Sequence, residues 1–334
     1  MNKPQAGPTV KPEFSEEGTG TSPFFTVQHH RQVLQDCLDV PGQPPSVAIA
    51  LDAVGISAKT VWIRLPQGRL PFDLRLEVDL AADRRGIHMS RLEEAISALH
   101  EPEFTDARQY ALELARLAIP GQESRRGRVE LSGRLPRLSR TGISGRSSLD
   151  AYDLRVEAEI TCSGERWHWR VGLGTGVNHI TACPCTQAYN RLLLAQPGKN
   201  TSLPGPGEAP LPTHSQRSHT MLTVFTEHQE AASVSPEPPV PDQELLLQCL
   251  AAALHLSQDL LKRPDEAELV YASHSHPQFA EDTVRETARA AGSRLGPLLP
   301  STSRVLIATV GLESIHSHDV HCRLDTTLAA LKGM

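Results

Sequence analysis

KTVWIRL at residues 59–65 and FDLRLEVDL at residues 72–80 alternate apolar with polar side chains. Successive side chains of a β-strand point to opposite faces of the sheet, so this alternation is typical of strands that bury one face. The segment Pro66-Gln67-Gly68 lies between the two stretches and suits a tight turn. The sequence therefore predicts a β-hairpin here, with one face against a core.

Two helices are predicted to follow the hairpin. Apolar residues recur at helical spacing through residues 92–99, and Ser90 with Glu93 three positions later fits a capping box. Residues 105–118 repeat the same helical period. The chain thus passes from two strands into two helices, as in an α+β protein.

The order of predicted elements then recurs along the chain. It indicates an α+β fold of two tandem ββααββ-type units with antiparallel sheets and helices on one face. We expect a disordered leader at residues 1–24, a first unit at 25–180 and a second at 181–334, with a Pro/Gly-rich surface insertion at 194–212. The later predicted elements are strands at 129–135, 152–161, 167–177, 219–225, 304–310 and near 320, and helices at 243–262 and after Pro277.

The composition is that of a globular protein in water, with 39% hydrophobic and 22% charged residues. The formal net charge of -6 gives no reason to expect nucleic acid or a membrane surface as a partner. We expect a cytoplasmic protein, because no apolar run could span a bilayer and the polar N-terminus lacks a signal sequence. Six cysteines in 334 residues are no disulfide framework, so a close cysteine pair favours a metal or a reactive thiol.

The most specific chemical pattern is Cys183-Pro184-Cys185. Alternate residues of a strand point the same way and the intervening proline fixes φ, so we expect both thiols on one side of the chain. His214, on a returning segment, can complete a soft-donor metal site. The plainer alternative is two small, buried and inert thiols at the end of a strand.

Further donors follow later in the chain. Glu266, Glu281 and His316 are carboxylate and imidazole groups of the kind that leave a zinc ion open for catalysis. Each also has a structural alternative, since acids near helix starts commonly offset the helix dipole and a histidine cluster can be a polar loop. Spacing alone does not separate these readings.

A second candidate site lies at residues 83–91 (DRRGIHMSR). Arg85, His88 and Arg91 surround a predicted helix start, and a helix N-terminus with neighbouring arginines is a natural anion site. Arg217 is a further residue that can bind phosphate in a bidentate manner. The alternative is a solvated turn capped by Ser90.

Six stretches, taken together and in order, resemble the type B family of GTP cyclohydrolase I, the prokaryotic, metal-dependent class. They span most of the chain, and their combination is far more specific than any one of them. The stretches are Arg85-Gly86-Ile87-His88-Met89-Ser90-Arg91, Cys183-Pro184-Cys185, His214-Ser215-Gln216-Arg217-Ser218-His219, Leu261-Lys262-Arg263-Pro264-Asp265-Glu266, Phe279-Ala280-Glu281-Asp282-Thr283-Val284-Arg285 and Glu313-Ser314-Ile315-His316.

The resemblance implies a tunnelling fold (T-fold) assembled as a homotetramer. It implies the first step of tetrahydrofolate and pterin biosynthesis, in which GTP and water give 7,8-dihydroneopterin triphosphate and formate. The implied cofactor is a divalent metal ion (Zn, Mn or Fe) that activates water for attack on guanine C8. By motif position, the implied metal ligands are Cys183, His214, Glu266 and His316, the catalytic residues are Cys185, Cys183 and His219, and the substrate-binding residues are Glu281, Arg217, Arg85, His88 and Arg91.

The chain departs from the family pattern at three places. Thr186-Gln187 stands where the family usually continues with Ser-Lys, and the Pro/Gly insertion separates the cysteines from His214. A few extra residues also lie between Glu281 and His316. Three alternatives stay open: another tunnelling-fold pterin enzyme, such as the archaeal-type relative that forms a cyclic phosphate; a non-catalytic zinc-stabilised binding protein; and a thiol redox protein. The absence of a Cys-x-x-Cys motif argues against the last.

Overall fold

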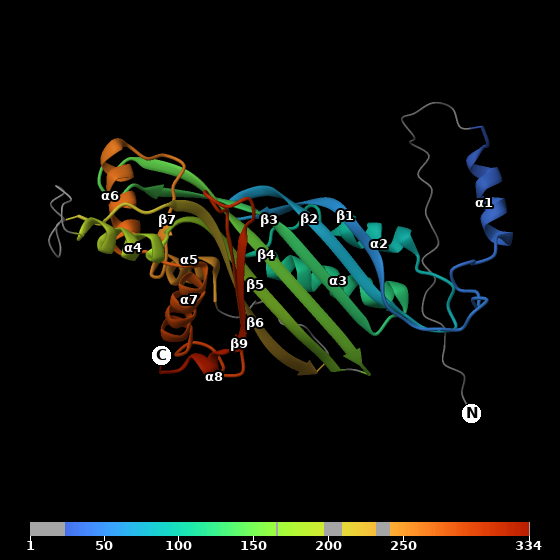
Figure 1. Ribbon diagram of the computed structural model, residues 1–334. Helices are drawn as coiled ribbons and strands as arrows, with labels where there is room; N and C mark the ends of the chain where they lie inside the picture. The colour runs from blue at the N-terminus through green and yellow to red at the C-terminus, as the bar shows by residue number, and fades with distance from the viewer. Residues whose placement is uncertain (1–23, 165, 197–208, 232–240, 334) are drawn as a thin grey trace.

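One antiparallel sheet runs through the whole molecule (Figure 1). The computed structural model describes residues 24–164, 166–196, 209–231 and 241–333. The strand order is β1-β2-β3-β4-β5-β6-β8-β9, and the short β7 pairs with β5. The strands are β1 (Leu51–Leu65), β2 (Gly68–Leu80), β3 (Arg126–Arg140), β4 (Ser147–Ser163), β5 (Arg166–Ala182), β6 (Ser215–Ala231), β7 (His255–Leu256), β8 (Arg304–Gly311) and β9 (Val320–Thr327).

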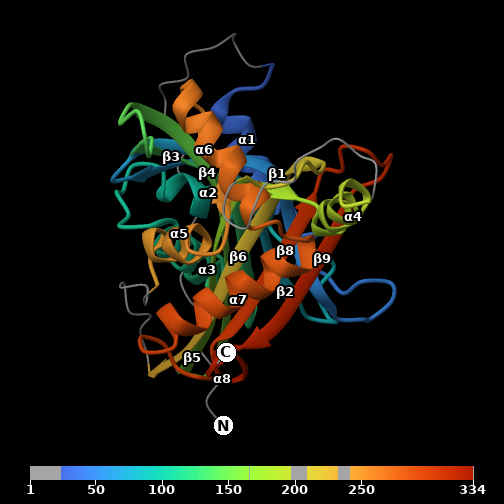
Figure 2. The same cartoon turned by 60° about the vertical axis from the view of Figure 1, so that its left-hand side comes forward.

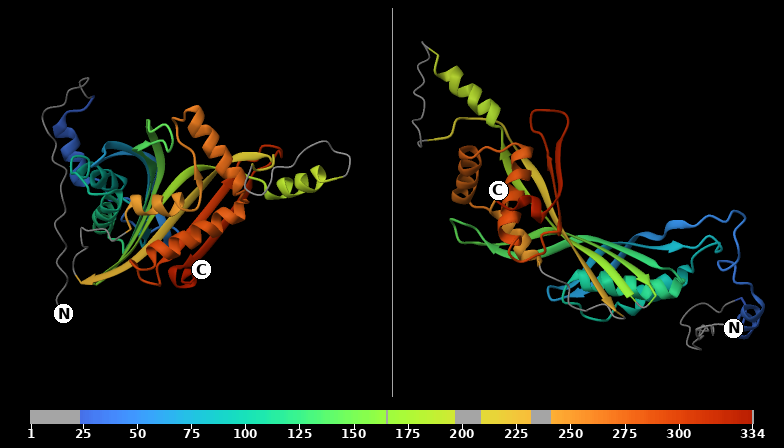
Figure 3. Two further views of the ribbon diagram at one scale, coloured as in Figure 1. Left: turned by 90° about the vertical axis from the view of Figure 1, so that its left-hand side faces the viewer. Right: turned by 90° about the horizontal axis from the view of Figure 1, so that it is seen from below.

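Helices cover the sheet at two places (Figure 2). Helices α2 and α3 pack on the half that contains β1 to β4, and α5 and α7 pack on the half that contains β5 to β9. Buried residues from all four helices belong to one core cluster. Helix α4 projects from the end of the sheet at which β5 finishes, and it buries none of its residues (Figure 3). The helices are α1 (Val27–Asp36), α2 (Met89–Ala98), α3 (Ala107–Gln122), α4 (Pro184–Leu194), α5 (Gln243–Ala251), α6 (Arg263–Ser275), α7 (Ala280–Leu295) and α8 (Leu328–Leu331).

The antiparallel α+β class predicted from the sequence is confirmed. Strand β5 pairs with both β4 and β6, so the predicted unit boundary at 180/181 falls inside a strand and the sheet continues across it. The division into two repeated units and the tunnelling fold itself stay predictions. The predicted leader falls almost entirely outside the described residues, as does most of the 194–212 insertion. Within the part that the structure describes, no helix is long and apolar enough to cross a membrane.

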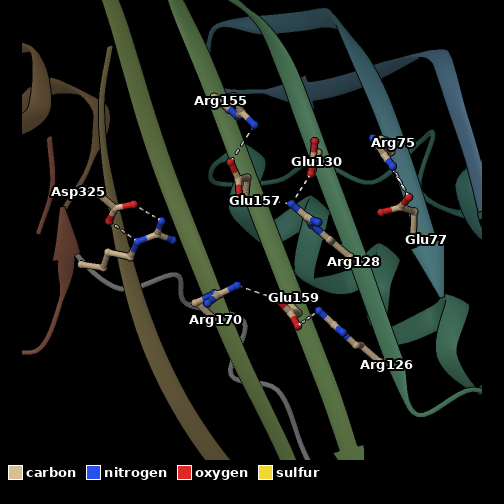
Figure 4. Close-up of polar contacts among 11 residues, drawn as sticks. Arg75, Glu77, Arg126, Arg128, Glu130, Arg155, Glu157, Glu159, Arg170 and Asp325 are labelled. Carbon is tan, nitrogen blue, oxygen red and sulfur yellow. Dashed lines mark hydrogen bonds and ion pairs between the residues drawn. The ribbon is translucent and has the colours of Figure 1, made fainter. Parts of the chain in front are cut away.

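Strict alternation gives the central strands one apolar face and one charged face. Val129 and Leu131 of β3 are buried under the helices, whereas the alternating Arg128 and Glu130 point to the other side. On that charged face ion pairs link neighbouring strands and neighbouring positions (Figure 4). They include Arg128–Glu130 at 2.6 Å, Arg126–Glu159 at 2.6 Å, Arg155–Glu157 at 3.0 Å, Arg170–Glu159 at 2.8 Å and Arg75–Glu77 at 2.6 Å.

The predicted helix at 243–262 is wrong in length. Helix α5 ends at Ala251, and the chain then forms β7. Directly after β7, Ser257 N donates to Asn178 O at 3.1 Å. Two further amides bind side chains of β4, since Asp259 N donates to Asp150 and Leu260 N donates to Ser148. These partners divert the backbone from helical bonding. Pro264 therefore does not end a helix: it lies in the first turn of α6.

The predicted cap at Ser90 is also wrong. Helix α2 begins at Met89 with His88 as its N-cap, and no side chain caps it. The carboxamide of Gln122 instead accepts from His88 N and donates to His88 O, both at 2.8 Å. These two bonds hold the backbone of His88, so the helix begins at Met89, before Ser90. Glu93 pairs with Lys59 at 2.6 Å and is not available to a capping box.

The two faces of β3 should differ sharply in their contribution to stability. Leu131→Ala removes a buried side chain and should lower the free energy of unfolding by about 2–5 kcal/mol. Arg128→Gln removes partly exposed ion pairs and should cost no more than about 1 kcal/mol. Urea unfolding monitored by circular dichroism measures both. Equal losses for the two variants would contradict the assignment of the charged face to solvent.

Candidate functional site

Cys183 lies where β5 ends and α4 begins. It is the N-cap residue of α4, and Pro184 occupies the first turn. Cys183 N donates to His214 O at 3.0 Å, and Thr213 Oγ1 donates to Cys183 O at 2.7 Å. The expected strand geometry of the two cysteines is therefore wrong, because a helix starts between them. The Cys183 thiol is half-buried, whereas Cys185 is exposed.

The chain around Cys183 brings His214 beside it. The backbone bond between the two residues joins the end of β5 to the start of β6. The Thr186 hydroxyl donates to Cys183 Sγ at 3.6 Å. The threonine that departs from the family pattern therefore contacts the cysteine thiol directly. His214 Nδ1 is buried and has no partner among the described residues. A thiol and an unpartnered imidazole nitrogen thus lie on neighbouring segments.

The loop between β8 and β9 packs against the same end of the sheet. Gln216 Nε2 donates to Glu313 Oε1 at 3.0 Å, and Leu312 N donates to Arg217 O at 3.0 Å. His316 of this loop is exposed and stacks on His318, with ring centroids 5.3 Å apart. The structure therefore places the His316 loop next to β6, with the imidazole facing solvent.

Asp265, the residue before Glu266, anchors the start of α6. Asp265 is buried in the first turn of α6 and accepts hydrogen bonds from Ile143 N, Ser144 N, Ser144 Oγ and Lys262 N. The bonds from the Ser144 hydroxyl and amide, with those from the other two amides, hold the pKa of Asp265 well below its usual range. This lock joins the tip of the β3–β4 hairpin to α6. The sequence motif contains Asp265, but nothing in its spacing reveals these partners.

Glu281 and His219 lie on opposite faces of the sheet. Glu281 is exposed in the first turn of α7 and makes no hydrogen bond or ion pair with other residues that the structure describes. His219 lies on the charged face, where its Nε2 is 2.8 Å from Asp153 Oδ2. A Cβ on Gly176 of β5 would lie 2.8 Å from His219 Nε2, so the imidazole occupies space left by that glycine. Asp153 was not predicted as a partner.

Arg85, His88 and Arg91 lie at the far end of the sheet. Through successive pairs, Val78 of β2 is level with Trp169 of β5. Trp169 precedes Ala182 by 13 positions within β5 (182 minus 169), so the two ends are roughly 40 Å apart at about 3.3 Å per residue. Figure 1 likewise shows α2 and α4 well separated.

The groups of this far end are partly bound to one another. Arg84 pairs with Glu123 at 2.8 Å, and Arg91 Nη1 donates to Gly121 O at 2.9 Å. Burial and the neighbouring Arg91 lower the pKa of His88. Arg85 is exposed, and its side chain has no partner among the described residues. Arg85 is thus the cation here that is most available to an anion.

The predicted metal ligands are only partly assembled in one chain. Cys183 and His214 fit a divalent ion, because thiolate and imidazole are ligands that zinc accepts and both lie at one strand end. Glu266 and His316 lie on separate exposed segments. Within the described residues, no group of three or more His, Cys, Asp or Glu side chains gathers into a metal cluster. The four-ligand set therefore stays a prediction.

Comparison with known proteins gives a consistent result. The family model described as type I GTP cyclohydrolase folE2 matches residues 37–322. The GTP cyclohydrolase MptA of Thermoplasma acidophilum is 28% identical over 304 residues, covering 90% of this chain and 98% of that protein. The GTP cyclohydrolase MptA of Haloferax volcanii is 27% identical over 311 residues, covering 88% and 96%.

Among solved structures, the uricase of Arthrobacter globiformis aligns with a TM-score of 0.48 and 10% sequence identity, covering 85% of this chain and 96% of that one. The uricase of Bacillus fastidious gives the same TM-score at 8% identity.

The Asp265 lock should make stability depend on acid pH. The pKa of Asp265 is depressed in the folded protein, so its contribution is present above the unfolded value of about 3.9 and fades as the pH falls. Asp265→Asn should therefore lower the melting temperature at pH 7, and its difference from the parent should shrink towards pH 3. Scanning fluorimetry between pH 3 and 7 measures this. Ser144→Ala, which keeps the carboxylate, is the control and should preserve part of the pH dependence. A constant difference at all pH values would contradict the lock.

Proposed function

This chain belongs to the type I GTP cyclohydrolase family, and from that premise we propose that it hydrolyses GTP to 7,8-dihydroneopterin triphosphate and formate. The observation that carries the proposal is the family match over residues 37–322. The residues that the sequence motifs single out lie inside that range, at the end of β5, at the start of β6, in the loop after β8 and near the starts of α2, α6 and α7. Pterin biosynthesis is the corresponding biological role.

Cys183 and His214 are the proposed anchor of a divalent metal ion, with Glu266 and His316 as the remaining ligands. The support is the pairing of the first two at one strand end and the unpartnered Nδ1 of His214. A bound ion of this kind would supply an activated water. The hydroxyl of Thr186 donates to Cys183 Sγ and so contacts the proposed ligand atom. The exposed Cys185 is proposed to act beside the metal.

Glu281 is proposed to hold the guanine base. A carboxylate accepts two hydrogen bonds, and guanine offers two neighbouring donors at N1 and the exocyclic amine. Adenine lacks that pair of donors and would leave the carboxylate unmatched. Glu281 suits this task because it is exposed and unpaired within the described chain.

His219 is proposed to carry protons during ring opening and closure. Asp153 accepts a hydrogen bond only from a protonated Nε2, so the pair assigns a proton to that atom. Nδ1 is then the nitrogen that can accept a further proton. Because His219 lies on the face opposite α7, a GTP molecule that it serves would take its Glu281 from another copy of the chain.

A second copy of the chain is proposed to complete the site, in a homotetramer. The triphosphate needs cations, and Arg85, His88 and Arg91 lie roughly 40 Å from Cys183 along the sheet. No single chain can bring both ends to one GTP molecule. Arg217, exposed at the start of β6, is the cation nearest in sequence to His214.

The second candidate is the archaeal-type reaction that forms a cyclic phosphate. The archaeal sources of the similar proteins named above favour it. Both reactions release formate. Formation of a cyclic monophosphate product also releases the other two phosphates of GTP as pyrophosphate.

The chain should release formate from GTP in a metal-dependent reaction. Purified protein with GTP and Mn²⁺ or Zn²⁺ should yield formate and, after oxidation, a fluorescent pterin. Retention of all three phosphates by the pterin supports the linear product, whereas pyrophosphate release supports the cyclic one. Chelation should abolish turnover and leave far-UV circular dichroism nearly unchanged, because the core is large enough to stand alone. Unfolding on chelation would instead indicate a structural metal.

Site sharing between copies predicts complementation. Cys183→Ala and Arg85→Ala should each be inactive, and co-refolding them in equal amounts should restore about a quarter of parental turnover, because random mixing pairs two intact halves in one case of four. Cys183→Ala mixed with His214→Ala is the matched control, since both lesions lie at the same end and no intact site can form. Equal recovery in the two mixtures, or none in either, would refute the shared site.

A further inference from the structure

Four buried side chains form a single file of hydrogen bonds across the sheet. His179 Nε2 of β5 is 2.8 Å from Thr220 Oγ1 of β6, which is 2.7 Å from Thr309 Oγ1 of β8. Thr309 Oγ1 is 3.1 Å from Thr283 Oγ1 of α7, and Thr283 Oγ1 donates to Ala280 O at 2.7 Å. All four side chains are 0% exposed. The file thus leads from the interior of the sheet to the first turn of α7.

The end of the file at α7 is a donor. Thr283 Oγ1 donates to Ala280 O and to Thr309 Oγ1, so its one proton is shared between the two acceptors. At the two inner contacts, His179–Thr220 and Thr220–Thr309, either atom can be the donor. His179 Nδ1 has no hydrogen-bond partner among the described residues, so the Nε2 contact with Thr220 is the one that ties this ring to the file.

The imidazole of His179 is neutral near pH 7. Burial, with smaller effects from His219 and His255, lowers the pKa of His179 to about 3. Nε2 of a neutral ring bonds a threonine hydroxyl as donor or as acceptor, so the contact with Thr220 holds at any pH near neutrality.

The file ends at Ala280, next to Glu281, the residue proposed to bind guanine. Glu281 lies between Ala280 and Thr283 in the first turn of α7, and its own carboxylate has no partner in the described chain. We propose that His179 is a positioning residue, which through Thr220, Thr309 and Thr283 fixes this turn and thereby orients the Glu281 carboxylate for the base. The orientation of Glu281 rests on the proposed function, whereas the hydrogen-bond file does not.

Helix α7 supplies a matched control. Thr287 lies one turn after Thr283, is likewise 0% exposed, and its hydroxyl has no partner among the described residues. Thr283→Val and Thr287→Val make the same isosteric change on the same buried face. Only the first removes a member of the file, so any difference between them reports on the file and not on packing.

The kinetic test compares these variants with Glu281→Gln. Thr283→Val should raise KM for GTP about tenfold, as expected for losing one buried hydrogen bond, with a smaller change in kcat. Thr287→Val should stay within about twofold of the parent. Because Thr283 acts through Glu281, the double variant Thr283→Val/Glu281→Gln should be no worse than Glu281→Gln alone. Additive losses, or equal effects at 283 and 287, would overturn the positioning role.

Two measurements test the file without GTP turnover. Hydrogen exchange measured by mass spectrometry should show faster exchange at the start of α7 in Thr283→Val and in His179→Leu, but not in Thr287→Val. His179→Gln, which keeps an N–H donor, should restore protection. Nitrogen-15 NMR of histidine-labelled protein should show a neutral His179 ring at pH 7; a doubly protonated ring would contradict its place inside the buried file. An inactive parent that still shows these results would sink the proposed function alone.

Discussion

Backbone pairing along β5 is the constraint on which the rest of the molecule depends. Its first part, as far as Gly176, pairs with β4 on one side and β6 on the other. Beyond Gly176 the partner on the β4 side is lost, and the two residues of β7 pair with His179 and Ile180 instead. Strand β5 therefore loses its long partner β4 a few residues before Cys183 and the other candidate site residues. The start of β6, the His316 loop and α4 all meet this end of β5, so a change in the register of β5 would move each of them.

Carboxylates that bind backbone amides hold the surrounding segments at that end. Asp265 joins the β3–β4 hairpin tip to α6, and Asp150 accepts bonds from Ser139, Ser148 and Asp259 N. Burial would raise the pKa of Asp150, but these hydrogen bonds lower it below the ordinary value. Both acids therefore stay charged at neutral pH inside a network of neutral donors. Such a bond needs no partner of opposite charge, which explains how hairpin and helix dock without an ion pair between them.

The sequence predicts those parts of the fold that depend on local pattern. Alternation is visible in β2, β3 and β4 because one face of each is buried and the other is charged, and motif order was enough to indicate the family. The start of α2 and the end of α5 could not be predicted, because Gln122 and the β7 pairing that fix them come from elsewhere in the chain. The same holds for the file at His179: no spacing rule connects residues 179, 220, 283 and 309. Motifs single out Cys183 and Glu281 as candidate site residues, whereas the contacts around Cys183 and around the first turn of α7 are visible only in the fold.

The glycine at position 176 has a consequence for how variation in this chain should be judged. An alanine there adds one methyl group, which is a small change by any measure of volume or polarity. That methyl would lie 2.8 Å from His219 Nε2, so the imidazole would have to shift from its contact with Asp153. Strand β5 thus makes room for the His219–Asp153 pair by omitting a side chain, and an alanine there would disturb that pair. Tolerance scores based on residue similarity would misjudge this position.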